Sequence, residues 1–207
     1  MKNRVITYID GFNLYHAIRE LSPERPWLKW LNLWSLSESF LKENQTLVEV
    51  NYFSAYSTWM PDRYKRHRDY TAALQAEQVK LVMGQFKTKN LKCPKCGRQY
   101  DTKEEKETDV NIALRVVTDA LLDRYDTAFL VSAGTDLRPA LDMVKSLRPD
   151  KRVLVVSPPK RRARARDLNP LFELTPGRLE QNLLRETYTL ANGKVIVQPG
   201  SYKRPRA

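Results

Sequence analysis

Residues 5–15 read VITYIDGFNLY, and this stretch decides how the rest of the chain is interpreted. Its first half is apolar and rich in β-branched and aromatic residues, which favours a strand. The run stops at Asp10 and Gly11, and Asn13 then opens a segment with the apolar spacing of a helix. In α/β sheets, ligand sites collect at the carboxyl ends of the strands. Asp10 and Asn13 are therefore candidate site residues, although the same side chains could simply end the strand and cap the helix.

The remainder of the chain alternates between strands and helices. Further strands are predicted at residues 46–54, 79–86, 127–132 and 153–157, and helices at residues 14–21, 33–41, 61–77, 109–122 and 137–147. This alternation indicates βαβ units, and so an α/β fold with a mostly parallel central sheet and helices on both faces. Thr108 is the expected N-cap of its helix. On that helix, an i, i+3 and i+4 spacing predicts a buried apolar face made of Val110, Ala113, Leu114, Val117 and Leu121.

Size and charge narrow the class of protein. The 207 residues fit a single domain spanning residues 1–207, and 36 Lys and Arg against 24 Asp and Glu give a formal net charge of +12. Such a field attracts polyanions, of which nucleic acid is the commonest in cells. No run approaches the roughly 18 apolar residues of a membrane helix, and the N-terminus shows no signal peptide. We therefore expect no membrane partner and a cytoplasmic location.

Basic residues gather in segments that could contact phosphate, although a solvated surface would show the same pattern. A basic C-terminal extension starts at about residue 158, and its residues 160–166 read KRRARAR. The candidate phosphate contacts are Arg66, Lys92, Arg161, Arg162 and Arg164. Beyond this extension, residues 195–198 are expected to add an edge strand, and residues 201–206 to form a frayed basic tail.

The only two cysteines, Cys93 and Cys96, lie in a polar hairpin insertion near residues 87–103. Their Cys-x-x-Cys-Gly spacing looks like half of a zinc knuckle, because two thiolates at this spacing can hold one tetrahedral Zn²⁺ ion. The ligands that could close such a site are His67, His16, a carboxylate or groups from a second subunit. The last choice leaves a homodimer open. A plain hairpin tip explains the pattern equally well.

Three aspartates stand at predicted strand ends or helix starts, namely Asp10, Asp109 and Asp136. In a parallel sheet these ends can converge on one edge, where clustered carboxylates repel one another unless they are protonated or neutralised by a metal ion. Hard oxygen ligands of this kind suit Mg²⁺ or Mn²⁺, which can activate water for attack on a phosphodiester. The sequence has no glycine-rich nucleotide-binding loop and no nucleophile elbow.

Three segments resemble motifs of the NYN domain family, the PIN-like nuclease group that includes LabA-type proteins. They are YIDGFNLY at residues 8–15, EKETDVNIA at 105–113 and LVSAGTDL at 130–137. The resemblance implies a three-layer, Rossmann-like PIN fold and metal-dependent cleavage of RNA. It also implies that Asp10, Asp109 and Asp136 are metal ligands, and that Asn13 orients a ligand or the scissile phosphate.

Two positions depart from the family pattern. Gly134 stands where family members typically have an acid, and Arg115 stands where another acid is often found. Asp119 cannot replace it, because ten residues of helix separate it from Asp109 by about 15 Å of rise. We therefore predict a ribonuclease dependent on Mg²⁺ or Mn²⁺, and keep as the alternative a catalytically impaired RNA-binding or scaffold protein. A DNA substrate would differ only in whether the ribose 2′-OH matters.

Overall fold

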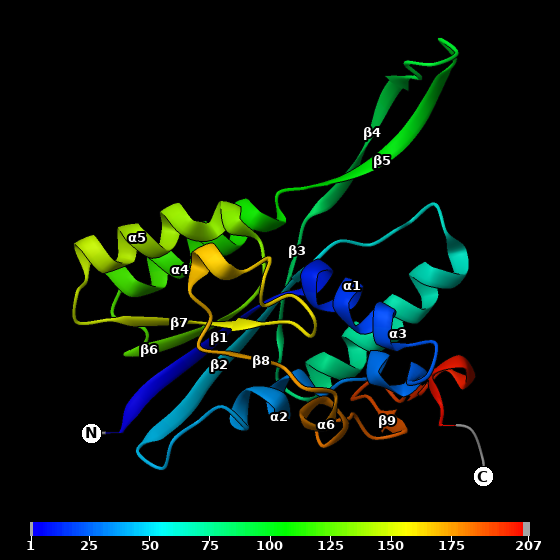
Figure 1. Cartoon of the computed structure of the whole chain (residues 1–207). Coiled ribbons are helices and arrows are strands. Elements are labelled where there is room, and N and C mark those ends of the chain that lie inside the picture. The colour runs from blue at the N-terminus through cyan, green and yellow to red at the C-terminus, as the bar shows by residue number, and fades with distance from the viewer. Residues whose placement is uncertain (1, 205–207) are drawn as a thin grey trace.

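The computed structural model describes residues 2–204 and shows a three-layer α/β fold (Figure 1). Its central sheet has the strand order β3-β2-β1-β6-β7-β8, and every neighbouring pair is parallel. These strands are β1 (Asn3–Asp10), β2 (Gln45–Ser54), β3 (Lys80–Met83), β6 (Thr127–Val131), β7 (Arg152–Ser157) and β8 (Phe172–Glu173). The predicted α/β fold with a mostly parallel sheet is confirmed.

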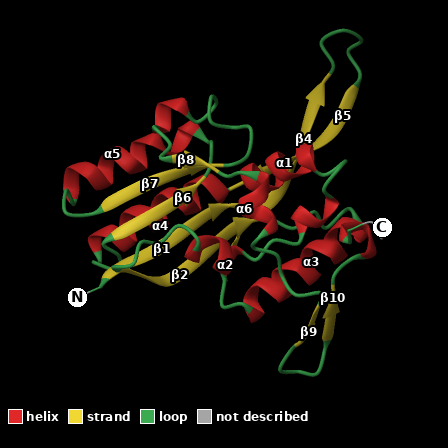
Figure 2. Ribbon diagram, turned by 60° about the horizontal axis from the view of Figure 1, so that its bottom comes forward, coloured by secondary structure: helices red, strands yellow, loops and turns green. Residues whose placement is uncertain are grey.

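Helices cover both faces of this sheet (Figure 2). One face is covered by α1 (Gly11–Leu21), α2 (Leu33–Glu38) and α3 (Pro61–Ala76), and the other by α4 (Thr108–Leu121) and α5 (Arg138–Leu147). Side chains of a strand alternate between the two faces, so Val5 and Ile9 join the core beneath α1 whereas Ile6 and Tyr8 join the core beneath α4. Within residues 2–204, no helix combines the length and the apolar character needed to span a bilayer.

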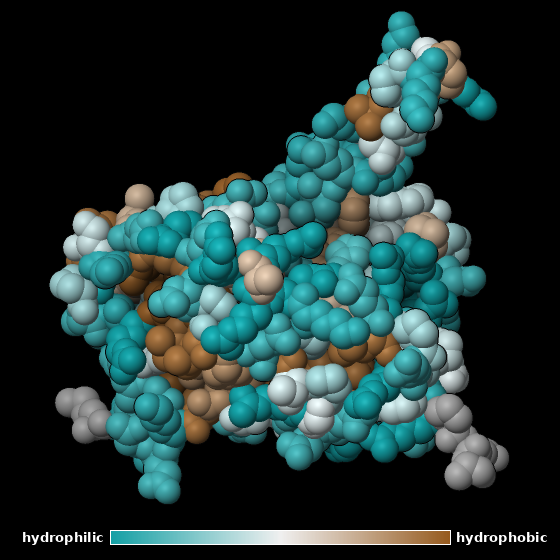
Figure 3. Space-filling view, viewed as in Figure 1, coloured by the Kyte–Doolittle hydropathy of each residue, from teal (hydrophilic) through white to brown (hydrophobic). Residues whose placement is uncertain are grey.

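A long hairpin, the β4–β5 arm, connects β3 to α4. Its strands β4 (Gln85–Lys92) and β5 (Gln99–Lys106) pair antiparallel and stand away from the body, with a mostly hydrophilic surface (Figures 1 and 3). The strand predicted at residues 79–86 is wrong at its end, because β3 stops at Met83 and the chain leaves the sheet at Gly84. A Cβ at Gly84 would lie only 2.7 Å from the carbonyl oxygen of Lys106, so the chain entering the arm and the chain leaving it lie against each other there.

The buried face of α4 also differs from the prediction. The structure buries Ile112, Val116 and Ala120 against the sheet, whereas Val110 and Leu114 are 60% and 62% exposed. Leu121 is exposed as well, and of the predicted face only Ala113 and Val117 pack partly buried against this core. Apolar residues occupy more than one stripe of this helix, so their spacing alone does not determine which stripe meets the sheet.

The C-terminal segment packs beside α1 and α3. After α6 (Pro176–Glu180), the strands β9 (Thr187–Thr189) and β10 (Val195–Val197) form a separate hairpin, so the predicted edge strand does not join the central sheet. A 3₁₀ turn, η4 (Gly200–Tyr202), follows, and the Arg204 guanidinium lies 5.0 Å from the ring centroid of Trp27. The prediction of a frayed tail is therefore wrong for residues 201–204, and its last residues, 205 and 206, lie outside the described residues.

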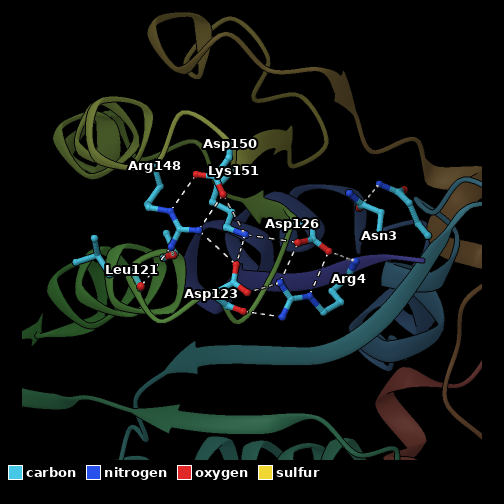
Figure 4. Close-up of polar contacts among 10 residues, drawn as sticks. Asn3, Arg4, Leu121, Asp123, Asp126, Arg148, Asp150 and Lys151 are labelled. Carbon is cyan, nitrogen blue, oxygen red and sulfur yellow. Dashed lines mark hydrogen bonds and ion pairs between the residues drawn. The ribbon is translucent and has the colours of Figure 1, made fainter. Parts of the chain in front are cut away.

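Charged side chains join the loops at the amino ends of the strands (Figure 4). Arg4 Nη2 lies 2.9 Å from Asp126 and 3.0 Å from Asp123, and Arg148 and Lys151 contact Asp123 in turn. The hydrogen bonds from Arg4 hold the pKa of Asp126 well below its usual range. This cluster lies at the opposite end of the sheet from Asp10, and we assign it to stability.

Candidate metal and RNA site

Asp10 ends β1 and is only 1% exposed. Its Oδ1 accepts the backbone N–H of Asn13 at 3.0 Å, so it caps α1, and its Oδ2 accepts the Ser132 hydroxyl at 2.8 Å and the Asn13 side-chain amide. Burial raises the pKa of Asp10, and these donors oppose the rise because they stabilise the carboxylate. Asp10 is therefore both the helix cap and a fixed carboxylate at the carboxyl edge of the sheet.

Gly11 follows Asp10 because the backbone here approaches β2 closely. A Cβ at Gly11 would lie 2.6 Å from the carbonyl oxygen of Phe53 and 2.6 Å from the ring of Tyr52. Any side chain would push the first turn of α1 away from β2. The glycine thus keeps both Asp10 and the Tyr52 ring in position.

The first turn of α4 brings Asp109 to the same edge. Part of this residue is open to solvent, but loss of hydration and then the charges of Asp10, Glu105 and Asp136 raise the pKa of its carboxyl to about 6. The structure therefore places the three aspartates singled out in the sequence at the same edge of the sheet, with Asp136 exposed in the 3₁₀ turn η2 (Thr135–Leu137) after β6.

Glu105 is a fourth acid, which the sequence analysis did not single out. Its Oε1 accepts the backbone N–H of Thr108 at 3.0 Å and also the Thr108 hydroxyl. Thr108 is the first helical residue and not the predicted N-cap, because Glu107 holds that place in a left-handed conformation with φ 81°. Glu105 is visible in the EKETD segment of the sequence. Residue preferences at the N-cap position do not predict it, however, because Glu105 caps the helix from three residues before Thr108.

The two departures from the family pattern lie in different places. A Cβ at Gly134 would lie 4.0 Å from Oδ2 of Asp10, so the missing acid would have belonged to this cluster. Arg115 instead belongs to a cluster beneath α4, where it contacts Glu49 at 3.0 Å and Asp119 at 2.9 Å. Asp119 is held in that second cluster and takes no part in the site.

The acid cluster fits a divalent cation in the chemistry of its donors, since hard carboxylate oxygens are the ligands that Mg²⁺ and Mn²⁺ prefer. Its spacing is looser than a closed metal site: among residues 2–204, no three His, Cys, Asp or Glu side chains are close enough to surround one ion. Asp10 is fixed by its donors, whereas Asp109 and Asp136 are open to solvent. These two side chains would have to move inward to hold a cation with Asp10.

The basic extension follows β7 and therefore starts at the same edge of the sheet. Arg162 and Arg164 are exposed there and free to contact phosphate. Arg161 is different, because its side chain is only 14% exposed and pairs with Glu20 of α1. Lys92 is exposed near the far end of the β4–β5 arm and not beside the acids.

Cys93 and Cys96 form the turn at the tip of the β4–β5 arm, and both are free thiols. Hydrogen bonds from the backbone N–H groups of Cys96 and Lys95 lower the pKa of Cys93. Neither His16, in α1, nor His67, in α3, completes a site with them, since the described part of the chain holds no group of three metal-binding side chains. The zinc site stays a prediction, and another molecule would have to supply its remaining ligands.

A cavity of about 140 Å³ opens on the α1 and α3 face of the sheet, beside Gly11 and Phe12. We call it the tyrosine pocket. Aromatic rings and basic side chains line it, among them Tyr15, Tyr52, Tyr70, Tyr202, Lys29 and Arg66. Of the predicted RNA contacts, Arg66 is thus placed at a pocket and not on an open helix face. Sequence analysis missed this pocket because its walls come from segments far apart in the chain.

The NYN domain family model matches residues 4–169. The chain belongs to the NYN domain family. This match confirms the family indicated by the three motifs and places the chain in the PIN-like nuclease superfamily, whose members generally use divalent metal ions. A crystal structure of a protein of unknown function from Vibrio parahaemolyticus has the same fold, with a TM-score of 0.56 and 17% identity. The similarity covers 88% of this chain and 97% of that chain.

A further relative is named as a monooxygenase and not as a nuclease. It is 6-hydroxy-3-succinoylpyridine 3-monooxygenase HspA from Pseudomonas putida, 25% identical over 190 residues. The match covers 75% of this NYN domain chain but only 59% of the length of the relative.

Proposed function

We propose that this NYN domain protein binds RNA and hydrolyses its phosphodiester bonds with Mg²⁺ or Mn²⁺. The observation that carries the proposal is the position of Asp10, Asp109 and Asp136 at one edge of the sheet, where loss of hydration and then the neighbouring acids raise the pKa of Asp109 to about 6, inside a chain with a net charge of +12. Acids held together against their repulsion favour a cation between them. The surrounding positive charge favours a polyanion.

Each part of the site has a distinct task in this proposal. Asp10, Asp109 and Asp136 would hold the metal ion, which when bound activates water and stabilises the charge that develops on the phosphate. Asn13 and Ser132 orient Asp10 through their hydrogen bonds. Arg162 and Arg164, which the sequence predicts as phosphate contacts, would hold the RNA backbone at the same edge of the sheet.

Cleavage of labelled single-stranded RNAs tests the proposal. We expect cleavage with Mn²⁺, none with EDTA, and none by Asp10→Asn. Asp167→Asn is the matched control, because it removes an exposed acid outside the cluster and should cleave normally. Intact RNA in every condition would contradict the proposal. The catalytically impaired alternative predicts salt-sensitive RNA binding that is indifferent to EDTA, without cleavage.

A second candidate function is oxidation of a small heteroaromatic acid. The tyrosine pocket favours it, because aromatic walls with basic residues suit a planar ring that carries an anion. The name of the Pseudomonas relative describes a reaction on such a ring. Hydroxylation of such an acid at an unsubstituted ring carbon would insert one atom of O₂ into a C–H bond and reduce the other atom to water with a reductant such as NADH. Hydroxylated product from a pyridine acid supplied with O₂ and NADH would support it, and unchanged substrate would exclude that acid.

A further inference from the structure

The tyrosine pocket has the size and position of a subsite for a single ring. Its volume of about 140 Å³ is close to that of an engineered protein cavity, about 150 Å³, which accommodates benzene. Gly11 and Phe12 line it, and Gly11 directly follows Asp10 in the chain. The pocket and the acid cluster therefore lie on the two sides of one helix start.

Basic side chains on the wall of this pocket lack acidic partners. Lys29, Arg63 and Arg66 all line it, and no carboxylate within residues 2–204 lies within 4.0 Å of the charged nitrogens of any of them. Burial and the charge of Arg66 lower the pKa of Lys29. The charges of Arg66 and Arg63 also oppose the burial that raises the pKa of Tyr202. Cations held near one another without a counter-charge form a site for an anion.

The interior of the pocket offers aromatic rings and a neutral imidazole. The Tyr52 and Tyr70 rings meet edge to face at 6.1 Å between centroids, and the Tyr52 hydroxyl lies 3.4 Å from Nε2 of His67. Burial lowers the pKa of His67 to about 4, so the imidazole is neutral at pH 7 and can donate or accept one hydrogen bond. Tyr15, which is 39% exposed, adds a ring that an incoming ligand can reach.

We propose that the tyrosine pocket binds one nucleotide of the RNA strand. The base enters beside the tyrosine rings and stacks on Tyr15, and the phosphate contacts Arg63, Arg66 and Lys29. This inference rests on the proposed function for its choice of RNA, since the ring and anion alone would also describe a free aromatic acid. Binding here would place the neighbouring phosphodiester beside Asp10.

Titration calorimetry in EDTA tests the pocket separately from cleavage. The probes are the four ribonucleoside 5′-monophosphates, ribose 5-phosphate, which has the anion without the base, and pyridine-3-carboxylate, which has ring and anion without ribose. We expect at least one nucleotide to bind more tightly than both other probes. Arg66→Ala and Tyr15→Ala should each weaken that binding about tenfold. Arg152→Ala, which removes an exposed arginine at the opposite edge of the sheet, should leave it unchanged.

The outcomes separate failure of the pocket from failure of the nuclease. Nucleotides that bind no better than ribose 5-phosphate, or whose binding ignores both pocket variants, would overturn the inference even if RNA is cleaved. Pyridine-3-carboxylate binding more tightly than every nucleotide would overturn it in favour of a small aromatic acid. Asp10→Asn should still bind nucleotide as the wild type does, so its loss of cleavage leaves the pocket intact. In a protein that cleaves, the pocket variants should raise KM for short RNAs and leave kcat within about twofold.

Discussion

Replacing Gly134 with aspartate should restore the carboxylate that this chain lacks. The backbone at Gly134 has φ −77° and ψ 108°, a conformation open to any residue. A Cβ there would come no closer than 3.4 Å to a neighbouring atom, the Ser132 hydroxyl oxygen. The substitution should therefore fit without displacing the backbone.

The size of the effect follows from the distance to Asp10. A Cβ at position 134 lies 4.0 Å from Oδ2 of Asp10. The new carboxylate lies one bond beyond that Cβ, so the two charges are about 5–6 Å apart and repel by about 3 kcal/mol at an effective dielectric constant of about 20. Solvent reaches this edge of the sheet, where Asp136 is exposed, so we halve this figure and expect a loss of about 1.5 kcal/mol in the free energy of unfolding at pH 8 without metal. A bound divalent cation would turn this repulsion into shared attraction.

Urea unfolding of the wild type, Gly134→Asp and Gly134→Asn in EDTA and in Mn²⁺ measures this effect. The asparagine variant is the matched control, because it has nearly the same shape without the charge. The aspartate variant should be less stable than the asparagine variant in EDTA, and Mn²⁺ should stabilise it more than it stabilises the wild type. If the two variants unfold alike in both conditions, position 134 does not share a metal site with Asp10.

Other perturbations test the remaining parts of the structure. The folded pKa of Asp109, about 6, lies above its ordinary value of 3.8, so the free energy of unfolding without metal should fall as pH rises through that interval. We expect this fall to be about 1 kcal/mol after allowing for exposure. Asp109→Asn should abolish it, as measured by thermal unfolding at pH 4 and 7.5. Gly11→Ala should lose about 2–3 kcal/mol in urea unfolding, since its Cβ would strike Phe53 and Tyr52; an unchanged midpoint would refute that close approach. The pKa of Asp126 is depressed, so the stability it contributes is present above pH 3.8 and is lost as pH falls below that value. Asp126→Asn should lower the free energy of unfolding by about 1 kcal/mol at pH 7. If the variant is destabilised equally well below pH 3.8, the ion pair does not explain its effect.

The site could be predicted from sequence where a local pattern determined both structure and chemistry. The run ending in Asp10 and Gly11 predicts a strand, a sharp turn and an acid at one edge of a sheet, and the structure has all three. Alternating strands and helices then bring the starts of α4 and η2 to the same edge. The convergence of Asp109 and Asp136 on Asp10 follows from this parallel topology and needs no detailed packing.

The errors occur where packing between distant segments decides the outcome. Two apolar stripes on α4 are equivalent in spacing, and only contact with the sheet selects Ile112 and Val116 over Val110 and Leu114. The strand end at Gly84 depends on the Lys106 carbonyl, which lies more than 20 residues further along the chain. The tyrosine pocket combines α1, β2, α3 and the C-terminal turn, so no single stretch of sequence reveals it.

The first residue of β4 and the last residue of β5 hold each other in place, since Gln85 pairs with Lys106 just before α4 begins. Residues can therefore be added to or removed from its outer part without moving the helix start that presents Asp109. Selection can lengthen or shorten this projection, and exchange the cysteine turn at its tip, while the acids stay where they are. The length of the β4–β5 arm and the arrangement of the acids can therefore change independently during evolution.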